Sequence, residues 1–186
     1  MDTGRRAFLR GHCPHRIVVP LRPPWAVMEA VFPQICDRCG DCIAACPTGV
    51  LVQGGGGFPE ADFSQGHCTF CANCAHACTT AAGRKTGTRH RPALAFSPAL
   101  PPWSLRAEVG AACLPHRGVL CRGCDERCEA GAIRFSPRAG TPAQPVIATD
   151  LCTGCGECVA ACPTQAISMK PCAPPPAPFA MERQGP

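Results

Sequence analysis

Cys152-Thr-Gly-Cys155-Gly-Glu-Cys158-Val-Ala-Ala-Cys162-Pro163 contains four cysteines separated by two, two and three residues, and it ends in a proline. This spacing is typical of the loop that ligates a 4Fe-4S cluster, in which three closely spaced thiolates wrap around one cubane. A fourth thiolate after the first turn of a following helix points elsewhere, and in two-cluster ferredoxins it ligates the neighbouring cluster. Structural zinc sites normally separate two C-x2-C pairs by a dozen or more residues, so the stretch predicts an iron-sulfur site rather than a zinc site.

Three more groups of cysteines resemble this stretch, and we number the four groups in chain order. Groups one and two keep its spacing at Cys36, Cys39, Cys42 and Cys46, and at Cys68, Cys71, Cys74 and Cys78. Residues 36–48 match residues 152–164 at nine of thirteen positions, which identifies an internal repeat. Gly40 and Gly156 fall inside the ligand loops, where a residue without Cβ permits the backbone angles that aim amides at cluster sulfurs. The alanines that follow these glycines predict a short helix close to each cluster.

The third group is irregular. Cys121, Cys124 and Cys128 align with the last three cysteines of the other groups, and Glu129 occupies the proline position. Cys113 is the candidate for the missing first ligand, displaced by an insertion in the loop. The alternative is a three-cysteine site that holds a labile or 3Fe-4S cluster. We favour the full set, because a solvent-exposed free thiol is vulnerable to oxidation.

The spacing between groups predicts an α+β fold of two tandem two-cluster modules, similar to bacterial ferredoxins. Cys36 and Cys68 are 32 residues apart, and Cys124 and Cys158 are 34 apart. If the fourth cysteines are exchanged within each module, there are four 4Fe-4S clusters. Their expected ligand sets are Cys36, Cys39, Cys42 and Cys78; Cys46, Cys68, Cys71 and Cys74; Cys113, Cys121, Cys124 and Cys162; and Cys128, Cys152, Cys155 and Cys158.

Composition suggests five segments along the chain. We expect a basic N-terminal arm over residues 1–29, modules over 30–82 and 111–170, a basic and proline-rich linker over 83–110, and a disordered proline-rich tail over 171–186. Within the first module, residues 58–63 are expected to return as a strand. Cys13 and Cys172 have no partner cysteines at ligand spacing and are expected to be unligated thiols. His67 and His76, which flank the second group, are expected to be surface residues.

The chain has few aromatic residues for a core, with 8 Phe, 2 Trp and no Tyr among 186 residues, but it has 18 cysteines. Cluster assembly can contribute to folding much as structural zinc does in small domains. A disulfide scaffold is the alternative, and it requires an oxidising compartment. We favour clusters because of the cysteine spacing and because no secretory signal peptide is recognisable.

The start of the chain, Gly4-Arg5-Arg6-Ala7-Phe8-Leu9-Arg10, resembles the core of a twin-arginine export signal. No apolar region of the length that export needs follows it, so we expect an uncleaved cytoplasmic protein. No segment approaches the roughly 20 apolar residues of a membrane span. The net charge of +5 is modest, and without interleaved aromatics or a recognition motif it does not indicate nucleic-acid binding.

Iron-sulfur clusters that are fully ligated by cysteine cycle by one electron without breaking bonds, so electron transfer is the expected function. No nucleophile lies beside its base in a recognisable motif, and every cluster cysteine belongs to a complete set, which leaves no open iron for catalysis. We therefore expect no catalytic residues and an electron-transfer or accessory protein rather than an enzyme.

Four features of the sequence belong together: the order of the cysteine groups, the displaced Cys113, the start at residues 5–11 and the stretch Arg22-Pro23-Pro24-Trp25. In these features the chain resembles the NapF family, the ferredoxin-type proteins of periplasmic nitrate reductase systems. The resemblance covers nearly the whole chain to about residue 170. It implies a cytoplasmic iron-sulfur protein that associates with the catalytic subunit NapA and assists its maturation, by supplying electrons or a cluster before export. Thr79 and Glu129 at the proline positions and the longer tail depart from the family pattern.

Three functional hypotheses remain open at this point. The chain is a general electron carrier, a maturation factor that helps to install the cluster of an apo-enzyme, or a periplasmic ferredoxin that feeds the reductase directly.

Overall fold

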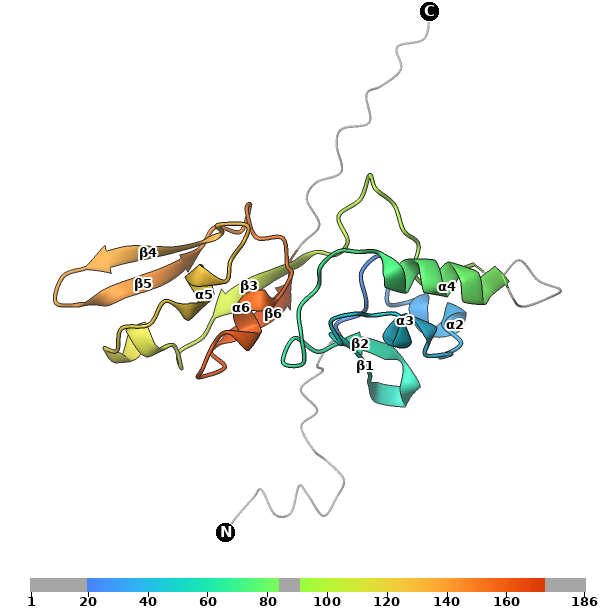
Figure 1. Ribbon diagram of the computed structural model, residues 1–186, viewed down its shortest axis with the longest axis horizontal. Helices are drawn as coiled ribbons and strands as arrows, with labels where there is room; N and C mark the ends of the chain where they lie inside the picture. The colour runs from blue at the N-terminus through green and yellow to red at the C-terminus, as the bar shows by residue number, and fades with distance from the viewer. Residues whose placement is uncertain (1–19, 84–90, 173–186) are drawn as a thin grey trace, which may run out of the picture.

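Short helices and two-stranded antiparallel sheets build the fold, as the α+β prediction requires. The computed structural model describes residues 20–83 and 91–172. We call residues 20–102 the N-terminal half and residues 103–172 the C-terminal half. The two halves lie side by side along the long axis of the molecule, with α2 (Phe32–Ile35) and β1 (Leu51–Gln53) in one and β3 (Leu105–Val109) in the other (Figure 1).

Each half contains one hairpin between its two cysteine groups. In the N-terminal half β1 pairs antiparallel with β2 (Pro59–Ala61), and the short 3-10 turn η1 (Gly55–Gly57) joins them. This confirms the expected strand within residues 58–63. In the C-terminal half β4 (Ile133–Arg138) pairs antiparallel with β5 (Thr141–Ile147).

Each half is also closed by a pairing between its first and last segments. In the C-terminal half β3 pairs antiparallel with β6 (Ile167–Pro171). In the N-terminal half the counterpart is a single antiparallel bridge between Ala26 and Leu94. Backbone hydrogen bonds from Val27 N–H to Ala93 O at 3.0 Å and from Ala95 N–H to Trp25 O at 2.9 Å flank this bridge. The two halves therefore share one connectivity.

A single-turn helix follows the ligand loop of groups one and four, as the alanines predict. Helices α3 (Asp41–Ala44) and α6 (Glu157–Ala160) begin after Gly40 and Gly156, whose φ angles of +80° favour glycine. Both helices end before a proline. The equivalent helix of group two, α4 (Asn73–Gly83), runs for 11 residues, because Thr79 at the proline position lets it continue.

The third group has two short helical turns. The 3-10 turn η2 (Leu114–Arg117) lies in the insertion after Cys113, and α5 (Gly123–Glu126) carries Cys124. Gly118, with φ +84°, ends η2 in the left-handed conformation. The insertion therefore forms a local turn of its own.

The structure places parts of the expected arm and linker inside the packed halves. Leu94 and Leu105, both in the expected linker 83–110, are 1% and 6% exposed, and the linker segment Leu105–Val109 is strand β3. Pro23 and Pro24 of the expected arm are fully buried. Short apolar runs among prolines suggest a linker in the sequence, but here they supply the strands that close each half.

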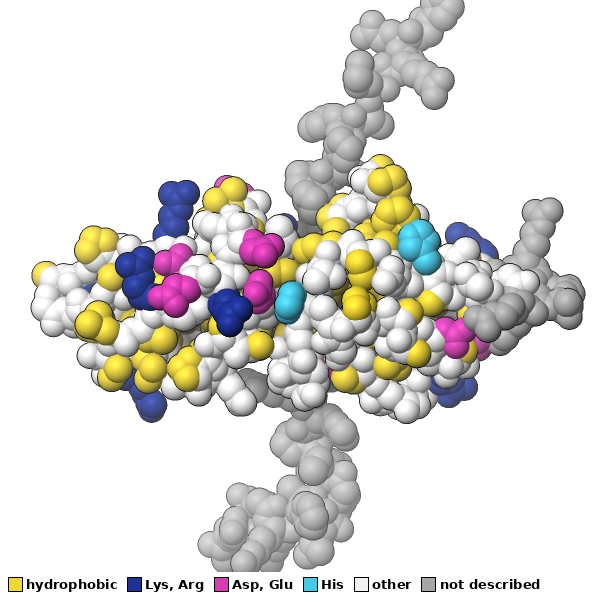
Figure 2. Space-filling model, viewed as in Figure 1, with side chains coloured by type: hydrophobic (Ala, Val, Ile, Leu, Met, Phe, Trp, Pro, Cys, Tyr) yellow, Lys and Arg dark blue, Asp and Glu magenta, His cyan; other side chains and the backbone are white. Residues whose placement is uncertain are grey.

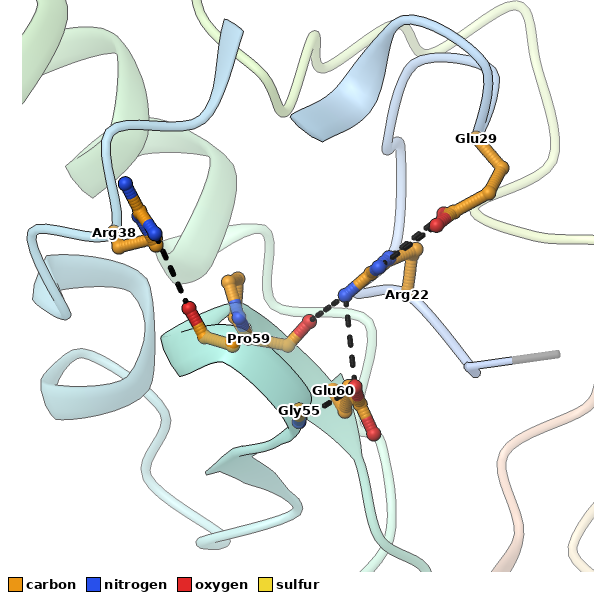
Figure 3. A network of polar contacts seen from close by, with 7 residues as sticks. Arg22, Glu29, Arg38, Gly55, Pro59 and Glu60 are labelled. Atoms are coloured by element: carbon orange, nitrogen blue, oxygen red, sulfur yellow. Dashed lines mark hydrogen bonds and ion pairs between the residues drawn. The ribbon is translucent and has the colours of Figure 1, made fainter. Parts of the chain in front are cut away.

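Arg22 attaches the described part of the arm to the N-terminal half (Figure 3). Its guanidinium donates to Glu29 through Nε and Nη2, each at 2.7 Å, and its Nη1 lies 3.7 Å from Glu60 Oε1. The same guanidinium lies 4.8 Å from the centroid of the Phe32 ring and 5.3 Å from that of Phe58. Hydrogen bonds and cation–π contacts thus hold residues 20–29 against α2 and the β1–β2 hairpin.

A small aromatic cluster lies where the two halves meet, and we call it the junction. The Phe63 and Trp103 rings meet edge to face with centroids 5.4 Å apart, and Phe70 approaches Trp103 at 6.3 Å. Phe63 also covers Gly156, where an added Cβ would lie 1.9 Å from the Phe63 Cδ1. One hydrophobic core continues from the N-terminal half into the C-terminal half through these contacts.

Apolar side chains reach the surface in several places over both halves, as one face of the molecule shows (Figure 2). The most exposed large ones in the described chain include Met28 and Leu120, at 77% and 83%. Within residues 20–83 and 91–172 no helix combines the length and hydropathy of a membrane span. The twin-arginine-like start, Cys13, three basic residues of the linker (Arg84, Lys85, Arg89) and the tail beyond Cys172 lie outside the described residues.

Candidate metal centres

Three cavities are each lined by four cysteines, and in each the fourth comes from the other group of the same half. We call these cavities sites I, II and III. Their cysteines are Cys36, Cys39, Cys42 and Cys78 at site I; Cys46, Cys68, Cys71 and Cys74 at site II; and Cys113, Cys121, Cys124 and Cys162 at site III. The grouping in space is the one that the fourth-cysteine exchange requires.

Site IV is the remaining set, Cys128, Cys152, Cys155 and Cys158. Cys158 is buried, and burial is the main cause that raises the pKa of its thiol to about 12. Repulsion from Cys155, Cys152, Cys128 and Cys124, in decreasing order, adds to the rise. The chain next to Cys128 lies against group four, because Arg127 Nη1 is 3.9 Å from Glu157 Oε1 and α5 packs against α6.

Cys113 lies where the displaced first ligand was expected. Burial raises the pKa of its thiol, the His116 amide lowers it, and repulsion from Cys162 and Cys121 adds to the rise. The insertion Leu114–Arg117 loops out while Cys113 stays at the wall of site III. This placement favours the four-cysteine alternative over a three-cysteine site.

Sites I, II and III each contain at least one cysteine whose thiol pKa is raised well above its ordinary value. Burial raises the pKa of Cys42 and of Cys68 to about 12, and that of Cys74 and of Cys124 to about 11. Repulsion between neighbouring thiolates adds to each rise. A buried set of thiols that cannot all ionise together is stabilised by a cation that takes up their charge, because metal ligation requires the deprotonated thiol.

The exchanged cysteines of groups one and four have a different environment. Burial acts to raise the pKa of Cys46, but hydrogen bonds from Thr48, Leu51 and Val50 outweigh it, so the pKa is lowered. At Cys162 burial is likewise outweighed, by the amides of Ala166, Thr164 and Ile167 and by the Thr164 hydroxyl. The Thr48 and Thr164 oxygens lie 3.6 Å and 3.7 Å from the two sulfurs. The Thr48 hydroxyl donates its one hydrogen to His67 O, so at Cys46 the backbone amides are the donors that lower the pKa.

Thr48 and Thr164 are functional residues that the sequence reasoning missed. Both stand two residues after the exchanged cysteine, in the segment where the repeats are identical, and that identity was the available signal. Hydrogen bonds to cluster sulfurs are one of the factors that set the reduction potential of an iron-sulfur protein. The Cys-Pro-Thr sequence thus places a hydroxyl and several amides around one ligand sulfur.

The donor sets fit a polynuclear cluster. Amide N–H groups point at ligand sulfurs at three sites: Phe70 to Cys68 at 3.4 Å, Ala132 to Cys128 at 3.3 Å, and Ala166 to Cys162 at 3.2 Å. In the described residues, no three His, Cys, Asp or Glu side chains converge as the ligands of one metal ion do. At sites I, II and III four cysteines line one cavity, as the ligands of a single cluster would.

The other residues that the sequence singled out lie away from these cavities. Cys172 is half-buried beside β3, where its amide donates to Ser104 O at 2.7 Å. His76 is exposed, as expected, and its ring lies 5.5 Å from that of Phe96. His67 is half-buried, and its carbonyl accepts a hydrogen bond from the Thr48 hydroxyl at 2.5 Å.

Two family models match the chain at these sites. Residues 35–82 match a 4Fe-4S dicluster domain, and residues 145–168 match a 4Fe-4S binding domain. The ferredoxin-type protein NapF of Escherichia coli K12 is 38% identical over 168 residues, which are 90% of this chain and 94% of that protein. The chain belongs to the NapF family of ferredoxin-type proteins. NapF of Haemophilus influenzae is also 38% identical, over 89% of this chain and 92% of its own.

A second kind of relative shares part of its length with this NapF-family chain. The ferredoxin-type protein NapG of Haemophilus influenzae is 31% identical over 82% of this chain and 58% of its own length. Membership of the family and the two 4Fe-4S matches identify a ferredoxin-type iron-sulfur protein. The stretch between the two matches contains Cys113, Cys121, Cys124 and Cys128, so the full cluster count rests on the geometry of sites III and IV.

Proposed function

We propose that the chain consists of two tandem two-cluster modules that hold four 4Fe-4S clusters at sites I to IV, with the sixteen cysteines of those sites as ligands. The observation that carries the proposal is the exchange in space: at sites I, II and III the fourth cysteine that lines the cavity comes from the partner group, and site IV is proposed by analogy. Such interlocking matches the ligand pattern of two-cluster ferredoxins.

A cluster that is ligated by four cysteines supplies one-electron chemistry when bound. The protein's own part is to hold the sulfurs, to donate amide and hydroxyl hydrogen bonds to them, and to control their exposure to water. Cys42, Cys74 and Cys158 are buried, whereas Cys39 and Cys71 are exposed. Sites I and II therefore each have one exposed cysteine, where a partner protein can approach.

We further propose that this electron-transfer protein acts in the cytoplasm on the catalytic subunit NapA of a periplasmic nitrate reductase system. It assists NapA maturation by supplying electrons or a cluster before export. Support comes from membership of the NapF family and from the exposed ligand sulfurs. A general electron carrier and a periplasmic donor to the reductase remain as the alternatives, and the protein is proposed not to be an enzyme.

Anaerobic iron and sulfide analysis with EPR tests the cluster count. We expect about four 4Fe-4S clusters per chain, and a count near two would refute the four-site arrangement. The Cys113→Ala variant should lose one cluster, whereas the Cys172→Ala variant, which removes a cysteine outside the four sites, should keep all four.

The role in maturation is tested by incubating the loaded protein with apo-NapA and following iron by spectroscopy. Transfer of iron and sulfide to NapA supports cluster supply, and reversible reduction with retention of the clusters supports electron supply. Failure of the two proteins to exchange either electrons or iron would refute the proposed partner. Fractionation tests the compartment, because recovery of the protein in the periplasm would contradict a cytoplasmic role.

A further inference from the structure

One direct backbone hydrogen bond joins a cysteine of site II to a cysteine of site IV. The Cys68 amide donates to the Cys155 carbonyl oxygen at 2.8 Å. Cys68 belongs to the N-terminal half and Cys155 to the C-terminal half, so this contact crosses the junction. It provides a short bonded connection between ligand residues that are 87 positions apart in the sequence (155 minus 68).

The surroundings of this contact are apolar and closely packed. Phe63 is 5% exposed, its ring lies against Trp103, and the Phe70 ring also approaches Trp103 edge to face. The close approach of Phe63 to Gly156 leaves no room for even a methyl group between α6 and the N-terminal half. Such packing fixes the separation of the two halves at this contact.

Within each half the two sites are joined in another way. Cys42 of site I lies on α3 and Cys74 of site II lies on α4, and these helices pack against each other. Cys124 of site III lies on α5 and Cys158 of site IV lies on α6, which also pack together. Sites I and II are therefore neighbours, as are sites III and IV.

We propose that the Cys68–Cys155 contact is the crossing through which single electrons pass between the two halves, so that the four sites form one line in the order I, II, IV, III. The proposal rests on the proposed occupancy of the sites by 4Fe-4S clusters. Each passage oxidises one cluster by one electron and reduces its neighbour by one, and no bond or proton moves. A low-potential one-electron donor would reduce the cluster at one end of the line, and a one-electron acceptor would oxidise the cluster at the other end.

The order predicts which clusters stay coupled when an end site is removed. In the Cys113→Ala variant, in which iron analysis and the absence of a 3Fe-4S signal show that site III has lost its cluster, the only remaining neighbour of site IV is site II across the junction. After full reduction with dithionite, we expect EPR to show three mutually interacting clusters and no isolated S = 1/2 signal. An isolated signal that integrates to about one spin per chain would overturn the proposal, because site IV would then have no neighbour.

Two matched glycine substitutions test the crossing itself in the Cys113→Ala background. Gly156→Ala pushes on Phe63 and should release an isolated signal, through loss of the interaction between sites II and IV. Gly40→Ala has the same φ of +80° at the equivalent position of a ligand loop but meets nothing within 4 Å, so it reports the effect of backbone strain alone and should release no isolated signal. An unchanged spectrum in Gly156→Ala as well would overturn the assignment of the crossing to this contact.

Failure of the proposal is distinguishable from failure of the proposed function. Iron analysis of the wild-type chain gives the cluster count independently of any interaction between clusters, so four clusters with an isolated site IV refute only the line. If Cys113→Ala does not fold, the Cys39→Ala variant serves in its place. It empties site I at the opposite end, and site II then has only site IV as a neighbour.

Discussion

Alanine substitutions at Gly156 and Gly40 separate the contribution of the junction to stability from the cost of local backbone strain. Both begin a single-turn helix with φ +80°, so alanine at either position pays the left-handed penalty of about 1–2 kcal/mol. Only at Gly156 does the new Cβ meet the Phe63 ring, at 1.9 Å from Cδ1 and 2.5 Å from Cε1. Overpacking of this kind typically costs about 1–3 kcal/mol more.

The expected difference between the two variants is therefore about 2 kcal/mol, which corresponds to roughly a 30-fold difference in rate. Unfolding of a protein that carries clusters is not a two-state equilibrium, so a rate is the appropriate observable. The assay is anaerobic bleaching of the cluster absorbance in a fixed concentration of guanidinium. Gly156→Ala should bleach about 30 times faster than Gly40→Ala, which itself bleaches somewhat faster than the wild type.

A double-mutant cycle identifies the cause. In a Phe63→Ala background the clash is absent, so Gly156→Ala should cost no more than Gly40→Ala. If the two glycine variants bleach within about threefold of each other, or if the cost at Gly156 persists without the Phe63 ring, the reasoning about the junction is refuted.

Three further predictions follow from the sites and from the arm. Replacing Cys162 with serine should disturb the cluster of site III before that of site IV, and EPR that shows the reverse would mean that ligation is local rather than exchanged. Thr164→Val removes a hydroxyl beside the Cys162 sulfur. A hydrogen bond worth about 0.5–1 kcal/mol corresponds to about 20–40 mV for one electron, so the reduction potential of site III should fall by that amount in an EPR-monitored redox titration. An unchanged or raised potential would contradict this role. The hydrogen bond from Arg22 lowers the pKa of Glu29, so the stabilisation it provides is present above the ordinary value of 4.5 and is lost as the pH falls through the lowered pKa. In the same bleaching assay Glu29→Gln should therefore bleach slightly faster than the wild type at pH 7, by less than about fivefold because the pair is partly exposed. The difference should close at acid pH, and a difference that stays constant would contradict the assignment.

The sequence was enough to predict the α+β class, the cysteine groups, the helix starts and which cysteines line each cavity. This was possible because ligand geometry acts over a few residues. Cys36, Cys39 and Cys42 must lie close together whatever surrounds them. The same locality explains the helix start at Gly40. Even the displaced Cys113 was recognisable, because only one cysteine stood near the gap in the pattern.

The closing strands were not predictable, because their partners are distant in the chain. Leu105–Val109 is five residues long and pairs with residues more than 50 positions later. Over so short a strand, the alternation of buried and exposed residues gives only a weak hydrophobic pattern in the sequence. Leu94 makes only a single bridge with Ala26. The extension of α4 past Cys78 followed from Thr79, whose effect on the helix could have been inferred from the missing proline. The junction depends on how two halves pack, which no local pattern in either half records.

The closing pairs also bear on how such a chain arises. In the C-terminal half Leu105 stands opposite Pro171, and in the N-terminal half Ala26 stands opposite Leu94, so each half begins and ends at one place. A unit whose ends meet can be copied head to tail by gene duplication without rearranging its internal pairing, and it tolerates new termini elsewhere. The two halves then differ in local features, such as the insertion after Cys113 and the longer helix α4, while they keep the same connectivity.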